Sequence, residues 1–124
     1  MKLNAVGVNS KNLKDSIKFY EILGFKFDDH NDFDDHVEAK QDGVKLMIDT
    51  FESVKEILGE EPRPSNHSSF ALEYESAQEL NDVVAKIEDA GFEVFKEPWD
   101  AFWGQRYCIV KDPSGYYVDL YAAL

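Results

Sequence analysis

The chain has 124 residues, a length that fits one domain with its own hydrophobic core. Its 13 basic and 25 acidic residues give a formal net charge of −12, and such a surface repels phosphate backbones, which argues against nucleic-acid binding. The single cysteine, Cys108, cannot form an internal disulfide. Because the sequence also shows no apolar leader and no apolar run long enough for a bilayer, we expect a cytoplasmic protein with no membrane contact.

The first half of the chain alternates short strand patterns with one amphipathic helix. Apolar residues recur at helical spacing from Leu13 to Leu23, with Ser10 or Asn12 as the candidate cap and Gly24 as the end. The expected strands are residues 3–9, 25–28, 36–40 and 44–50, with an acidic hairpin region at 29–35 and an Asp-Gly turn at 42–43. A short helix is expected at 51–58.

The second half repeats this order after a linker at residues 59–68 that contains Pro62 and Pro64. A helix begins at Ser76, where Glu79 completes a capping box, and ends at Gly91. The expected strands are residues 69–75, 92–96, 106–110 and 116–122, with a loop at 97–104.

Two local matches relate the halves. Residues 22–27 match 89–94, residues 43–48 match 115–120, and Ala5 pairs with Ser69. We therefore predict an α+β fold in which one βαβββ unit is used twice, as one domain over 1–124 with modules at about 1–58 and 69–124.

The segment Lys111-Asp112-Pro113-Ser114-Gly115 is a tight turn that delivers the last strand. Asp112 can bond the backbone two residues on, and Gly115 accepts a positive φ. This turn, the segment 19–25 and the segment Trp103-Gly104-Gln105-Arg106 together resemble the vicinal oxygen chelate superfamily of glyoxalases, bleomycin-resistance proteins and extradiol dioxygenases. The resemblance implies that two βαβββ modules form a cup-shaped mixed sheet, commonly in a homodimer.

Metal-dependent members of that superfamily take ligands from the first and fourth strand of each module. On this sequence the matching positions are Ala5, Met47, Ser69 and Asp119, of which Asp119 alone is a good ligand for a hard metal ion. His67 would need a shift of two residues to serve, and the acidic stretch 28–35, which contains His30 and precedes His36, does not follow a calcium-loop pattern. We therefore expect no metal and no cofactor, which places the chain closest in character to metal-free bleomycin-resistance-like members.

The cup then presents a small-molecule lining. The expected ligand-binding residues are Met47, Ser69, Glu73, Trp99, Phe102, Trp103, Tyr107, Tyr117 and Asp119. The aromatic residues of the loop suit a planar or cationic ligand, or instead pack against the sheet or a dimer partner. Glu73 and Asp119 could form a carboxylate pair, whereas Arg106 is expected to pair structurally with an acid and Cys108 to be a buried thiol.

Three functions remain open. The first is a metal-free protein that binds a small molecule and sequesters a cationic or aromatic antibiotic, with no catalytic residue. The alternative is a metal-dependent lyase, isomerase or dioxygenase of the same superfamily, which requires a recruited ligand such as His67. A third is a member that binds a metabolite or peptide in a regulatory complex.

Overall fold

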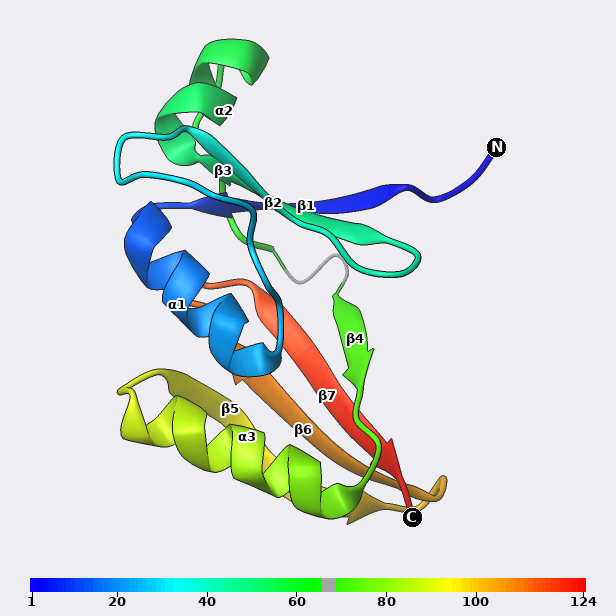
Figure 1. Cartoon of the computed structure of the whole chain (residues 1–124). Helices are drawn as coiled ribbons and strands as arrows, with labels where there is room; N and C mark the ends of the chain where they lie inside the picture. Colours follow the sequence, from blue (N-terminus) through cyan, green and yellow to red (C-terminus); the bar gives the residue numbers. More distant parts are fainter. Residues whose placement is uncertain (66–68) are drawn as a thin grey trace. The chain divides into compact units, whose positions relative to one another are not determined.

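The computed structural model describes residues 1–65 and 69–124 (Figure 1). The chain divides into two compact units, unit 1 at Met1–Pro64 and unit 2 at Ser65–Leu124. The division lies within the stretch 59–68 that the sequence indicates as a linker. Each unit contains its own mixed sheet and a helix against it, as the α+β prediction requires.

Unit 1 has a three-stranded sheet in the order β1-β3-β2, with β1 at Ala5–Ser10, β2 at His36–Ala39 and β3 at Lys45–Thr50. Strands β1 and β3 are parallel, and β2 is antiparallel to β3. Helix α1 (Leu13–Leu23) begins at Asn12, whose side chain accepts a hydrogen bond from the Asp15 amide, so Asn12 is the cap among the two candidates. Gly24 ends the helix at φ 116°, a conformation that favours glycine. Helix α2 (Phe51–Leu58) follows β3 directly, as expected.

The prediction of a strand at residues 25–28 is wrong. The structure has only an isolated bridge between Phe27 and Ala39 there, with the Asp28 amide donating to the Glu38 carbonyl. The following residues fold on themselves, because the Asn31 amide donates to the Asp34 carboxylate and the Phe33 amide donates to the Asn31 side chain. Such side-chain bonds offer the backbone an alternative to a strand ladder.

Unit 2 has a four-stranded sheet in the order β4-β7-β6-β5. Its strands are β4 (Phe70–Glu73), β5 (Glu93–Ala101), β6 (Gln105–Lys111) and β7 (Tyr117–Ala123), and β4 is parallel to β7.

Helix α3 (Ala77–Asp89) of unit 2 begins at Ser76, whose hydroxyl accepts a hydrogen bond from the Glu79 amide. The helix ends at Ala90, one residue before the predicted Gly91. The Glu79 carboxylate accepts from the Glu75 amide and not from Ser76, so the capping box is shifted by one residue.

The prediction of a loop at residues 97–104 is wrong for residues 97–101, which are part of a strand. Strand β5 continues to Ala101, with irregularities of register between Val94 and Lys96 and between Lys96 and Trp99. The turn is confined to residues 102–104. Cross-strand pairs hold the extension, since Trp99 lies opposite Tyr107 and Asp100 lies opposite Arg106.

The turn before β7 has the predicted geometry. The Asp112 carboxylate accepts from the amides of Ser114 and Tyr116, both at 2.9 Å, and Gly115 adopts φ 99°. Asp112 is only 4% exposed, so its backbone bonds lie away from water. The turn therefore fixes where β7 starts and which of its side chains face each way.

Alternation divides each sheet into a buried and an open face. Val8, Leu46 and Ile48 of unit 1 and Val110, Val118 and Leu120 of unit 2 are buried. The alternate residues, such as Met47, Tyr107 and Asp119, are partly exposed and form the open faces. None of the described helices is both long and apolar enough to cross a bilayer. The cup and the homodimer stay predictions.

Candidate ligand-binding site

Asp119 lies on β7, on the open face of unit 2, and is held by two hydroxyl donors. Its Oδ2 atom accepts a hydrogen bond from the Tyr107 hydroxyl at 2.9 Å and one from the Ser69 hydroxyl at 3.3 Å. The parallel register explains the second contact, because Asp119 is opposite Ala71 and Ser69 lies two residues before Ala71, on the same side of the chain. Two residues predicted from the sequence, Ser69 and Tyr107, thus converge on one carboxylate oxygen of the third, Asp119.

The aromatic residues beside Asp119 form a continuous surface, which we call the aromatic platform: Trp99, Trp103, Tyr107 and Tyr121. Trp99, Tyr107 and Tyr121 are consecutive partners across β5, β6 and β7. The ring centroids of Trp99 and Tyr107 are 5.3 Å apart, and those of Tyr107 and Tyr121 are 6.1 Å apart with an interplanar angle of 15°. The Trp103 ring packs edge-on at 5.5 Å from Tyr107, and its indole N–H donates to Gln105.

The structure corrects the expected source of these aromatic residues. Trp99 belongs to the regular part of β5 and not to a loop, so its ring is fixed by the sheet. Tyr121 is part of the platform although it was not among the predicted site residues. Its alternation with Asp119 and Tyr117 along β7 places it on their face of the sheet.

The remaining predicted residues lie outside the platform. Phe102 is 98% exposed and contacts the Trp103 ring edge-on. Tyr117 packs against Phe95 with ring centroids 4.9 Å apart, in a separate cluster on β7 and β5. Glu73 is opposite Tyr121 on the edge strand β4, and no hydrogen bond between Glu73 and Asp119 is among the described contacts. Met47 lies on β3 of unit 1.

The phenol of Tyr107 is a poor acid in this setting. Partial burial, followed by the hydrogen bond to Asp119 and the negative charge of Asp119, raises the pKa of Tyr107 to about 12. The hydroxyl therefore keeps its proton near neutral pH and donates it to the carboxylate. A ligand meets an acceptor at Asp119 and the flat faces of the aromatic rings, which together suit a donor group attached to a flat or cationic body.

The four positions at which the superfamily places metal ligands do not fit a metal. The register supports their equivalence, because Met47 lies opposite Gly7, two residues after Ala5, as Asp119 lies opposite Ala71, two residues after Ser69. A methyl group, a thioether, a hydroxyl and one carboxylate are a poor donor set for a hard divalent ion. Across the part of the chain that the structure describes, no group of three or more His, Cys, Asp or Glu residues could hold one. His67, the residue considered as a replacement, lies outside the described residues.

An ionic network on the open face of unit 1 was missed by the sequence reasoning. His36 is the first residue of β2, within the strand predicted at 36–40, and its Nδ1 atom is 2.6 Å from Asp49 while its Nε2 atom is 3.1 Å from Glu38. The Lys45 ammonium is 3.2 Å from Glu38. The hydrogen bond to Asp49, followed by that to Glu38, raises the pKa of His36, which favours its charged form.

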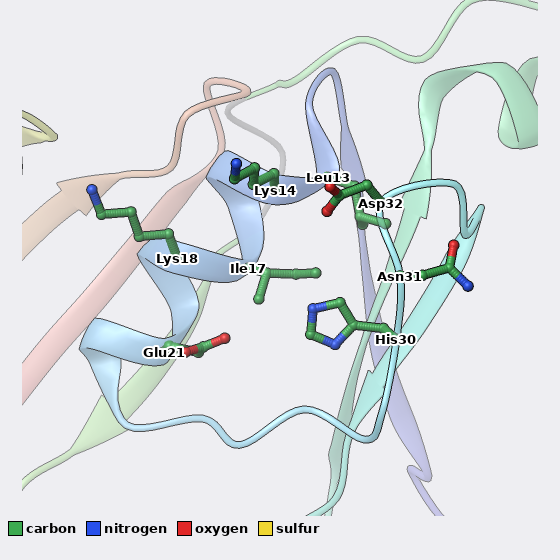
Figure 2. A pocket seen from close by; sticks show the side chains of 8 residues that line it. All are labelled: Leu13, Lys14, Ile17, Lys18, Glu21, His30, Asn31 and Asp32. Carbon is green, nitrogen blue, oxygen red and sulfur yellow. The ribbon is translucent and has the colours of Figure 1, made fainter.

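Unit 1 also has a surface cavity of about 280 Å³ between α1 and the loop after it (Figure 2). Figure 2 shows His30 and Ile17 lying across from one another, with the charged ends of Lys14 and Lys18 toward the outer side of the helix. The His30 Nδ1 atom is 3.0 Å from the Asp28 carbonyl, which orients the ring. The cavity mixes basic and acidic side chains over a small apolar floor, and this lining selects no one class of ligand.

Arg106 and Cys108 have the structural roles that were expected. The Arg106 guanidinium donates to Asp100 at 3.0 Å and to the Asn81 side chain of α3 at 3.3 Å. Cys108 is fully buried, and burial raises the pKa of its thiol to about 12. Neither side chain is available to a ligand on the open face.

Comparison with known proteins places this geometry in a family. No curated protein matches the chain. A hypothetical protein from S. aureus is similar in structure, with 21% sequence identity, a TM-score of 0.80, and coverage of 94% of this chain and 90% of that one. A glyoxalase/bleomycin resistance protein/dioxygenase from Nocardioides has 21% identity and a TM-score of 0.74, covering 100% of this chain and 84% of the other. A glyoxalase-related enzyme from Fulvimarina pelagi has 18% identity and a TM-score of 0.85, covering 98% and 88%.

At such identities the solved structures show the fold alone. The family model of the Glyoxalase/Bleomycin resistance protein/Dioxygenase superfamily matches residues 2–120, which is nearly the whole sequence. The chain therefore belongs to the Glyoxalase/Bleomycin resistance protein/Dioxygenase superfamily.

Proposed function

We propose that this protein is a metal-free binding protein that holds a cationic or aromatic small molecule on the open face of unit 2. Sequestration of an antibiotic of that kind is the specific form of the proposal, and a cytoplasmic homodimer is its expected setting. The observation that carries the proposal is the aromatic platform beside Asp119, where three rings line up across adjacent strands.

Asp119 supplies the polar part of recognition. Both of its described hydrogen bonds go to the Oδ2 atom, which leaves Oδ1 as the acceptor for a ligand N–H or O–H group. The two donors on Oδ2 are neutral hydroxyls, so neither of them forms an ion pair that would compete with a cationic ligand. The net charge of −12 adds a favourable long-range field for the same class of molecule.

The donor chemistry at Ala5, Met47, Ser69 and Asp119 supports a metal-free function over the enzymatic alternative. The superfamily alternative, a metal-dependent lyase, isomerase or dioxygenase, would need ligands other than these four.

Isothermal titration calorimetry tests the proposal with copper-bleomycin and related cationic glycopeptides as ligands. The Asp119→Ala variant should bind roughly 10- to 100-fold more weakly, since a hydrogen bond to a charged group contributes about 1.5–3 kcal/mol. Asp89→Ala, at the end of α3, is the matched control for loss of one negative charge and should leave the affinity unchanged. No heat at high micromolar ligand for the unmodified protein would refute this form of the proposal.

Metal analysis addresses the alternative directly. Protein purified without chelator is measured by mass spectrometry of its metal content, and the same preparation is run in sedimentation equilibrium for the homodimer. A stoichiometric divalent metal that is lost in Asp119→Ala would favour the enzymatic reading over ours.

A further inference from the structure

The face of Trp99 is already covered by a cation that belongs to the protein. The Lys96 ammonium lies 3.8 Å from the centroid of the Trp99 ring, well inside the distance of about 6 Å at which cation–π contacts matter. The Lys111 ammonium, over the neighbouring Tyr117 cluster, is farther from its rings, at 5.2 Å from Tyr117 and 5.9 Å from Phe95. Trp99 is thus the ring of unit 2 with the tightest cation contact that the structure shows.

A β-bulge creates this contact. Lys96 pairs with Ile109 and Trp99 pairs with Tyr107, so three steps along β5 are matched by two steps along β6. In a regular strand, residues three apart point to opposite faces, and the extra residue of the bulge brings both side chains to the open face. The backbone irregularity therefore serves to set Lys96 beside the aromatic platform.

The Lys96 side chain has little else to hold it there. It is exposed, and it forms no ion pair within the ranges that the structure describes. Its row of the sheet runs from Lys96 through Ile109 to Asp119, so the ammonium and the carboxylate lie on the same face with an apolar side chain between them. A flexible lysine stem can leave the ring at small cost when another cation takes its place.

We propose that Lys96 is a tethered competitor for the ligand: its ammonium occupies the cation position on Trp99, and an organic ammonium ligand displaces it on binding. This inference rests on the proposed function and narrows the ligand class from cationic or aromatic molecules to organic ammonium compounds. The ligand carries a primary or quaternary ammonium group on a scaffold that also donates to Asp119. A neutral aromatic molecule that stacks on Tyr107 and Tyr121 leaves Lys96 in place, so the competition is selective for charge.

The affinity of Lys96→Met and Lys86→Met for benzyltrimethylammonium is compared by calorimetry, with benzyl alcohol as the neutral probe. Methionine keeps the length and removes the charge, and Lys86 on α3 controls for a general change of net charge. We expect Lys96→Met to bind the cation roughly fivefold more tightly, because a contact of cation–π strength no longer has to be broken. Lys86→Met and all titrations with benzyl alcohol should be unchanged.

An independent readout needs no ligand affinity. In the unmodified protein, the ring current of Trp99 should shift the NMR signals of the Lys96 ε-methylene protons upfield, and saturating benzyltrimethylammonium should return them to ordinary values. Unshifted Lys96 signals in the free protein, or equal tightening in both lysine variants, would overturn the inference and leave the proposed function standing. Failure of the cationic probes and of the antibiotics to bind any variant would overturn the proposed function, and the inference with it.

Discussion

Removing the phenolic hydroxyl of Tyr107 tests whether the site is organised around Asp119. The Tyr107 hydroxyl donates to the Asp119 carboxylate at 2.9 Å, and a hydrogen bond to a charged group contributes about 1.5–3 kcal/mol when shielded. Both side chains are only partly buried, so water competes and we expect a coupling of about 1 kcal/mol.

The assay is a double-mutant cycle over Tyr107→Phe, Asp119→Ala and the double variant, measured by urea unfolding. The two tryptophans of the chain, Trp99 and Trp103, both lie in unit 2, so their fluorescence reports the unfolding of that unit. Tyr117→Phe is the control, because the Tyr117 ring packs on Phe95 and no hydrogen bond of its hydroxyl is among the described contacts.

A second measurement determines the pKa of the Tyr107 hydroxyl. In Asp119→Asn, the pKa of Tyr107 should fall below about 12, because a negative charge beside the phenol is removed, and should stay above 10, since burial is the larger cause of the shift. Ultraviolet absorbance of tyrosinate, taken as a difference against Tyr107→Phe, gives this value. A coupling below about 0.3 kcal/mol together with an unchanged pKa would refute the reasoning.

Three further outcomes follow from single contacts. Asp112→Ala should lower the free energy of unfolding by about 2–4 kcal/mol in urea titrations, because two amide donors lose a buried carboxylate, and Asp112→Asn should cost less because one acceptor oxygen remains. The pKa of His36 is raised above 6.5, chiefly by the hydrogen bond to Asp49, so the charged ring stabilises unit 1 below pH 6.5 by no more than about 1 kcal/mol. This contribution is lost as the pH rises through the pKa of His36 in the folded state. Circular dichroism melts from pH 6 to 9 should show the loss, and the His36→Gln variant should lack this pH dependence. Cys108 should resist a thiol reagent at pH 8 until the protein is unfolded, because the thiol is buried with a pKa of about 12; rapid labelling of the native protein would contradict this.

The features that the sequence predicted well are those encoded by local patterns. The turn at Asp112 and Gly115 needed only residue types with strong conformational preferences, and the faces of β7 followed from the alternation of tyrosine and aspartate with apolar residues. Asp119 and Tyr107 were therefore assigned to the correct face before their contact was known. Their hydrogen bond joins residues on different strands and could not be read from either strand alone.

The features that were missed depend on partners distant in sequence. Residues 97–104 were predicted as a loop, but pairing of Trp99 and Asp100 with β6 keeps most of that segment in the sheet. His36 was expected on a strand, but its ionic partners were not predicted. Its partner Asp49 lies 13 residues away and is brought beside it by the antiparallel register of β2 and β3.

The same register shows how the repeat has been used for two different chemistries. Met47 of unit 1 occupies the position of Asp119 in unit 2, so the pair His36 and Asp49 corresponds to the pair Tyr107 and Tyr121. At equivalent places on equivalent strands, unit 1 carries an ionic pair and unit 2 carries stacked rings. Shared backbone geometry therefore does not transfer a function between the modules, and the cation-binding proposal follows from the side chains of unit 2. Replacing Tyr107 by histidine and Tyr121 by aspartate would give unit 2 the ionic pair of unit 1; we expect that variant to keep the strand register and to lose the affinity for aromatic cations.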